Sequence, residues 1–289
     1  MTLDRALERL HAGDIPGLSA LLRDDPSLVH ARVASNEGHY CGYFHRATLL
    51  HHVAGNPTIA PLPANILELA TLILDAGAEV DAVTEAGPSQ PTDIGWTTLG
   101  LAATGLEIRE AGRQAAMMEL LLARGADVNA RNGGPLVGAL YYGEDAASRL
   151  LVERGARVDF VAAAGLGRID LMTPFVGADG ALAADASSLV LYDAGVVART
   201  PDEILRYALR LAAGAGQRDA VAYLLDVGAD LRGHGRVTPL HLAALRGHAP
   251  VCDLLLARGA DATVRDPEHD ATPRQWAVHG GHHELAARL

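Results

Sequence analysis

Histidines and a cysteine in the N-terminal third of the chain are the residue types best suited to chemistry. His39, Cys41, His45 and His52 follow one another in the order H-x-C-x3-H-x6-H. Imidazole nitrogen and thiolate sulfur are ligands that zinc prefers, but the order lacks the paired CxxC or HExxH spacing that identifies a zinc site. We therefore predict neither a metal site nor a cofactor from this set.

Catalysis by a nucleophile has little more support. Cys41 has histidines close in sequence, so a Cys–His pair is conceivable, but no third group that would orient the base is in evidence. Cys252 lies in a leucine-rich stretch, where a thiol acts as a small apolar side chain. His279, His282 and His283 could chelate a metal, although a solvated polar cluster is the simpler interpretation. No pair of carboxylates stands out, so we assign no catalytic residue and leave the enzyme question open, with the balance against.

Aromatic side chains gather in the same region, although they make up only 4% of the chain. Two long connecting stretches, 31–46 and 82–96, contain four of them, three within residues 40–44. Ordered long loops often carry function. The alternative is that these rings only seal an irregular N-terminal junction. We predict a partner- or ligand-binding site formed by His39, Tyr40, Tyr43, Phe44, His45, His52, Trp96, Tyr141 and Tyr142.

The composition restricts the class of protein. Lys and Arg number 24 against 35 Asp and Glu, a net charge of −11, which argues against a nucleic-acid partner because such proteins need a basic face. A hydrophobic content of 49% indicates a large core, and two cysteines fit a reducing compartment. No apolar run approaches the roughly 18 residues of a membrane span, and the first residues do not resemble a signal peptide. We expect a cytoplasmic protein with no membrane partner.

An internal repeat determines the elements that must position these side chains. A leucine-rich stretch closed by Gly-Ala recurs with its glycine at 77, 125, 155, 228 and 259, and a degenerate copy places one at 195. The successive spacings of 48, 30, 40, 33 and 31 indicate a period near 31–33 with insertions. Residues 208–230 align with 239–261 at a constant offset of 31. Such register across two expected helices argues against a chance match.

A second motif precedes the first by about half a period. Its best copy is TPLHLAALRGH at 238–248, and a later copy is TPRQWAVHGGH at 272–282. Thr238 can cap a helix whose first position is proline, and Ala243 is small enough to let two helices approach. Gly259 suits a position just after a helix that needs a positive φ. Thr200 and Glu203 form a capping-box pattern at another such start.

Thr-Pro-Leu-His-x-Ala-Ala, followed by a second leucine-rich helix and Gly-Ala-Asp, resembles the ankyrin repeat over nearly the whole chain. The resemblance implies an all-α ankyrin-repeat solenoid of helix-turn-helix units with hairpin-like connecting loops, about eight units including caps, in a single domain 1–289. The divergent copies and insertions look bacterial. The expected units are 1–32, 46–81, 96–129, 134–159, 160–195, 200–230, 238–261 and 272–289.

The resemblance also assigns roles to single residues. His51 and His241 occupy its Thr-x-x-His position, where the imidazole bonds to backbone in the turn. His248 and His282 occupy its Gly-His position, which is also structural. The last unit stops one helix short of completion, and we expect it to be a C-terminal cap.

Ankyrin arrays, by resemblance, are mostly protein-binding scaffolds with no chemistry of their own. The acidic balance favours a partner with basic or neutral contact residues. We therefore predict a non-enzymatic protein–protein interaction scaffold that binds a protein partner through its concave face and its long N-terminal loops. The alternative is a small-molecule binder or unusual enzyme with a His/Tyr/Cys-lined pocket under loops 31–46 and 82–96.

Overall fold

The computed structural model describes residues 2–33, 44–55, 61–85, 95–183, 185–187, 189, 200–232 and 237–289. Regular structure in these residues is helical, and strand-like pairing is limited to isolated bridges. The fold class is therefore all-α, as predicted. Backbone contacts divide the chain into two compact units, which are described separately. Unit 1 contains Met1–Ala139 and Ala146–Ala156, and unit 2 contains Leu140–Asp145, Arg157–Leu191 and Val196–Leu289.

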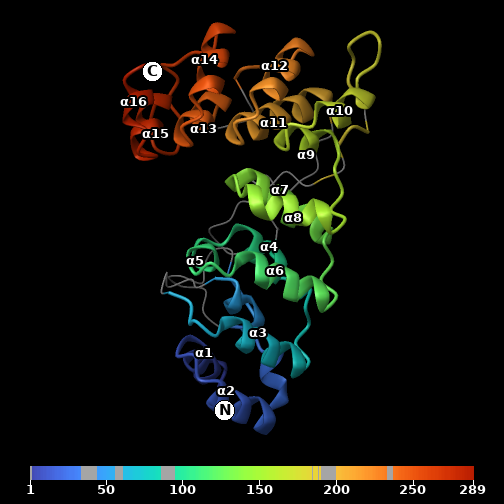
Figure 1. Cartoon of the computed structure of the whole chain (residues 1–289), viewed down its shortest axis with the longest axis vertical. Helices are drawn as coiled ribbons and strands as arrows, with labels where there is room; N and C mark the ends of the chain where they lie inside the picture. Colours follow the sequence, from blue (N-terminus) through green and yellow to red (C-terminus); the bar gives the residue numbers. More distant parts are fainter. Residues whose placement is uncertain are drawn as a thin grey trace. The chain divides into compact units, whose positions relative to one another are not determined.

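The helices of unit 1 form two layers (Figure 1). One layer consists of α1 (Leu3–His11), η3 (Leu49–Val53) and α4 (Thr98–Thr104), and the other of α2 (Ile15–Asp24), α3 (Ile66–Asp75) and α6 (Gln114–Ala123). The 3-10 helix η1 (Pro26–Val29) follows α2, and the insertion between α4 and α6 forms α5 (Leu106–Glu110). Helices α7 (Ala130–Tyr142) and α8 (Asp145–Glu153) each have residues in both units.

Unit 2 repeats the same pairing of a first and a second helix. The first helices are α9 (Phe160–Gly165), α11 (Pro201–Gly214), α13 (Pro239–Leu245) and α15 (Pro273–His279), and successive members contact each other (Figure 1). The second helices are α10 (Ile169–Met172), α12 (Arg218–Asp226), α14 (Ala249–Ala257) and α16 (His283–Ala286). The 3-10 helix η4 (Thr173–Phe175) follows α10.

The prediction that the last unit lacks its second helix is wrong. Helix α16 follows α15 after a short turn, and its residues Leu285 and Ala286 are buried. One helical turn suffices here because it buries these two side chains in a helix that contacts α15. Whether this unit is a cap stays a prediction, as does the single domain 1–289.

The two recurring motifs fold alike wherever they occur. The glycines of the leucine-rich motif at 77, 125, 155, 228 and 259 all have φ between 91° and 102°, as predicted for residues that follow a helix. Thr200 and Glu203 form the predicted capping box at the start of α11. Ala212, Ala243 and Ala277 have no accessible surface. These small side chains allow neighbouring first helices to pack closely.

The long connecting loops of unit 1 begin and end as hairpin stems. Arg32 pairs with Thr48, and Val83 pairs with Thr97, in isolated antiparallel bridges. Each bridge joins the residue capping a first helix to the segment that precedes the loop. The stems of the hairpin-like loops are therefore present, whereas residues 34–43 and 86–94 lie outside the described residues.

Candidate functional site

The Thr-x-x-His turns show how the repeat positions its first helices. The backbone N–H of Thr48 donates to Nδ1 of His51 at 3.0 Å, so the ring proton lies on Nε2. Nε2 then donates to the carbonyl oxygens of Ala82 (3.0 Å) and Trp96 (3.1 Å). Burial lowers the pKa of His51 to about 4. The imidazole therefore closes the turn and joins it to the next loop, as predicted.

The same arrangement recurs at Thr238 and His241 in unit 2. Nδ1 of His241 lies 2.8 Å from the Thr238 hydroxyl, and Nε2 lies 3.1 Å from the carbonyl oxygen of Ala271. Burial lowers the pKa of His241 as well. His248 has a structural role too, because its Nε2 lies 3.0 Å from the carbonyl oxygen of Gly214. These histidines support the fold.

The predicted N-terminal site residues that the structure describes are buried. Phe44, His45, His52 and Trp96 expose 9% or less of their surface. The Phe44 and His52 rings lie 5.2 Å apart, and the His11 ring lies 5.8 Å from that of His52. Burial, followed by the nearby imidazoles of His11 and His51, lowers the pKa of His52 to about 3. His39, Tyr40 and Tyr43 lie outside the described residues.

The stems of the two long loops are joined to each other. The guanidinium of Arg32 donates to the carbonyl oxygens of Arg46 and Val83, each at 2.8 Å. The backbone N–H of Glu85 donates to the carbonyl oxygen of His45 at 2.9 Å. The stems of both loops therefore lie side by side, as a binding site formed by the two loops together requires. The pocket predicted under them stays a prediction.

Tyr141 and Tyr142 belong to unit 2, where they differ in exposure. The Arg210 guanidinium lies 5.2 Å from the centre of the Tyr141 ring, and its Nη2 donates to the Tyr141 hydroxyl at 3.0 Å. Arg246 donates to the carbonyl oxygens of Tyr141 and Gly214. Tyr141 is thus bonded to Arg210 of α11 and to Arg246, which directly follows α13. Tyr142 packs edge-on against Tyr141 and remains 49% exposed.

Chemistry at a metal or a thiol finds no further support in the structure. Among the described residues, no three His, Cys, Asp or Glu side chains form a group that could hold a metal ion. Cys252 is buried, and burial raises its pKa to about 12, which keeps the thiol protonated. Cys41 lies outside the described residues. The predicted lack of a metal, cofactor and catalytic residue stays a prediction.

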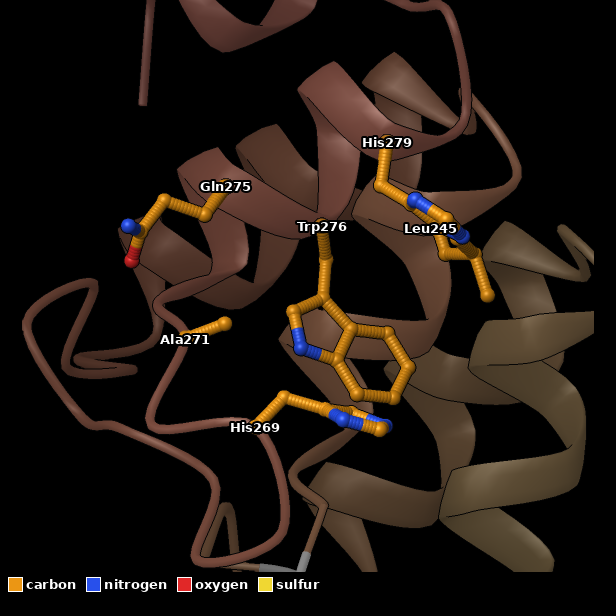
Figure 2. A pocket seen from close by; sticks show the side chains of 6 residues that line it. All are labelled: Leu245, His269, Ala271, Gln275, Trp276 and His279. Atoms are coloured by element: carbon orange, nitrogen blue, oxygen red, sulfur yellow. The ribbon is translucent and has the colours of Figure 1, made fainter.

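A groove of about 480 Å³ on the first helices of unit 2 was not predicted from the sequence. Figure 2 shows the Trp276 indole projecting from α15 toward His269, with Ala271 on one side and His279 and Leu245 on the other. Gln275 completes the lining. Trp276 is half-buried, and its ring lies edge-on to that of His241 at 5.4 Å. The turn histidine thereby supports an aromatic surface that remains open to the groove.

A buried carboxylate holds the Trp276 indole in this orientation. Oδ2 of Asp266 accepts from the indole Nε1–H at 2.9 Å and from the N–H of Ala271 at 3.2 Å. Oδ1 accepts from the N–H groups of His269 and Glu268 at 2.8 and 3.1 Å. Burial raises the pKa of Asp266, but these hydrogen bonds outweigh it and leave the pKa below its ordinary value. Asp266 is therefore ionised.

Repeat register could have revealed two residues that sequence analysis missed. Trp276 stands where the preceding repeat has Leu242, so a large aromatic ring replaces an aliphatic side chain. Arg210 stands where the following repeat has His241, at the offset of 31. Both are departures from an otherwise regular motif, and each has a contact that its counterpart lacks. The N-terminal aromatic cluster drew attention away from them.

The comparisons with known proteins identify the repeat class. Residues 185–266 match the family model for ankyrin repeats (3 copies). The match covers parts of unit 2 that include α11–α14, and ankyrin repeats generally mediate protein–protein interactions. The described helix pairs have an all-α ankyrin-repeat fold.

Two relatives that match parts of this chain are much longer proteins. An ankyrin repeat and KH domain-containing protein of Caenorhabditis briggsae is 29% identical over 222 residues, which are 75% of this chain and 8% of the relative. The palmitoyltransferase Hip14 of Drosophila melanogaster is 37% identical over 81 residues, which are 27% of this chain and 13% of the relative. The chain thus spans a small part of each relative. None of the described helices is long and apolar enough to cross a membrane.

Proposed function

We propose that the chain is a non-enzymatic protein-interaction scaffold in a cytoplasmic setting, and that it binds its partner through the first helices and the connecting loops. The supporting observation is the contrast between buried and groove-lining positions of the repeat. Ala212, Ala243 and Ala277 are the same residue at the same register, and all are buried. Two residues further along the first helix, Leu245 and His279 differ from each other and line the groove.

This division separates stability from recognition. Positions that hold neighbouring helices together must remain small, whereas groove-lining positions can change without loss of the stack. The joined stems of the two N-terminal loops support a second contact region, to which we assign His39, Tyr40 and Tyr43. We also propose that the chain has a bacterial source and that its binding face is concave.

The test is cross-linking of the full chain to a partner purified with it, followed by mapping of the cross-linked residues. We expect cross-links on first helices and connecting loops, and few on the outer sides of second helices. Tyr142→Ala should weaken partner binding because Tyr142 is exposed at the end of α7, which precedes α8 as a first helix precedes a second. Tyr223→Ala, on the second helix α12, is the matched control and should leave binding unchanged. Cross-links concentrated on second helices would reject the proposal.

A further inference from the structure

The groove at Trp276 has an electrostatic property that selects among occupants. Asp266 has no accessible surface, and no ion pair to it occurs among the described residues. Its carboxylate instead accepts hydrogen bonds from backbone N–H groups and from the Trp276 indole. The nearby Arg265 contacts Asp270, not Asp266. A negative charge that hydrogen bonds stabilise, and that no ion pair neutralises, therefore lies at the edge of the aromatic ring.

A cation is the occupant that this charge favours. The face of an indole attracts a cation through its quadrupole, and tryptophan is the best aromatic residue for this contact. A carboxylate accepting from the indole N–H adds attraction of the same sign. The net charge of −11 acts in the same direction at longer range. Electrostatics at the ring and over the whole chain thus agree.

The shape and lining of the groove select the kind of cation. Leu245 and Ala271 offer apolar surface beside the ring, which suits the methylene stem of a long basic side chain. His269 and His279 offer ring nitrogens that can accept a hydrogen bond when neutral. A guanidinium is planar, stacks on aromatic faces and carries several donors, whereas an ammonium does not stack.

We propose that the groove binds an arginine side chain from an exposed segment of the protein partner, with the guanidinium stacked on Trp276. This inference rests on the proposed function, because it names the chemistry of the partner at one part of the binding surface. The contact combines the aromatic face of Trp276, the charge of Asp266 and the apolar surface of Leu245 and Ala271.

The experiment follows the indole N–H signals of the ¹⁵N-labelled full chain by NMR. Only Trp96 and Trp276 give such signals, and Trp276→Leu assigns them. The probe is the capped peptide Gly-Arg-Gly, added to about 10 mM because a single side chain binds weakly. Matched probes carry citrulline, a neutral isostere of arginine, or leucine at the central position. We expect the arginine peptide to shift the Trp276 signal and leave that of Trp96 in place.

The matched probes and variants decide the outcome. The citrulline and leucine peptides should bind at least about fivefold more weakly than the arginine peptide. In the same spectra, Trp276→Leu should abolish the shifts that the arginine peptide causes in the backbone N–H signals of Leu245 and Ala271. This variant should fold because the preceding repeat carries Leu242 at this register. Equal or tighter binding of the leucine peptide, no shift with arginine, or persistence of the arginine shifts in Trp276→Leu would overturn the inference. If the chain binds its partner but the arginine peptide causes no shift, only the inference about the groove is wrong. If the cross-links are confined to second helices, the proposed function is wrong.

Discussion

The turns at Thr48–His51 and Thr238–His241 have the same chemistry in different surroundings. In both, the threonine hydroxyl lies 2.8 Å from Nδ1 of the histidine, and Nε2 reaches carbonyl oxygen of the following loop. The first turn leads into the five-residue 3-10 helix η3, whereas the second begins the seven-residue α-helix α13. The capping interaction therefore sets where a first helix starts but does not determine its geometry.

The residue that follows each histidine accounts for a second difference. His52 follows His51 and has no accessible surface, whereas Leu242 follows His241. Unit 1 thus buries two adjacent imidazoles where unit 2 buries an imidazole and an aliphatic side chain. Nε2 of His51 lies 3.0 and 3.1 Å from two carbonyl oxygens, whereas His241 has one such contact at 3.1 Å and a further backbone interaction with Val264. The N-terminal turn therefore depends more on polar groups that burial makes sensitive to pH.

The largest effect is expected from a charge placed in the closely packed α13. Ala243→Asp buries a carboxylate without a partner and should cost about 3–5 kcal/mol. Because repeats depend mainly on their neighbours, hydrogen exchange in α13–α16 should lose protection before exchange in α1–α3. Ala257→Asp, at an exposed site on α14, is the control and should change little. Uniform loss of protection through both units would contradict the expectation that each repeat depends mainly on its neighbours.

The next largest effect is expected from acid, which should destabilise the turn at Thr48–His51 more than the turn at Thr238–His241. The pKa values of His51 and His52 are about 4 and about 3, below the ordinary value of 6.5. Below pH 6.5 the unfolded chain therefore binds protons that the folded chain excludes, so stability is lost as the pH falls. Between pH 6.5 and 4.5 the loss should be on the order of 2–3 kcal/mol per histidine.

Urea unfolding at several pH values, followed by fluorescence of Trp96 and Trp276, measures this dependence. The Trp96 transition should move to lower urea more steeply with acid than the Trp276 transition. His52→Leu, which copies Leu242 of the other turn, should reduce the slope at Trp96. If the two transitions move equally with pH, the turns do not differ in the way their burial indicates.

Removal of the turn histidines should have a smaller effect, and it should be unequal. His51→Ala leaves the carbonyl oxygen of Ala82 without its donor, and it removes one of the two donors to that of Trp96, which keeps the N–H of Thr84. It should cost about 2–3 kcal/mol. His241→Ala removes the bond to Ala271 and the interaction with Val264, and should cost about 1–2 kcal/mol. Urea unfolding at pH 7.5 measures both. Equal losses would show that the second carbonyl contact of His51 adds no stability.

Much of the fold could be predicted because its signals are local. The capping threonines, the alanines of the first helices and the glycines with positive φ all follow from the conformational preferences of single residues. The error at α16 has a physical cause as well. A single helical turn has too few residues for a periodic pattern, so only its burial of Leu285 and Ala286 reveals it.

The candidate site was harder to predict because it depends on exposure. Phe44, His52 and Trp96 have residue types typical of a binding site, yet they are buried against other parts of unit 1. The sequence shows which side chains are near each other along the chain, but it does not show which of them reach the surface. Trp276 shows the converse, because a single aromatic residue in a regular motif is inconspicuous until its surroundings are known.

The amino-acid sequence by itself determined the repeat, its register and the residues that start and end each helix. These depend on backbone preferences and on spacing along the chain. Only the tertiary structure decided that the N-terminal rings are interior, that Arg210 and Arg246 bond to Tyr141, and that Trp276 faces a groove beside a buried carboxylate without an ion pair. Burial arises between residues far apart in sequence, and the hydrogen bonds of Asp266 depend on the conformation of its loop, so the repeat pattern encodes neither.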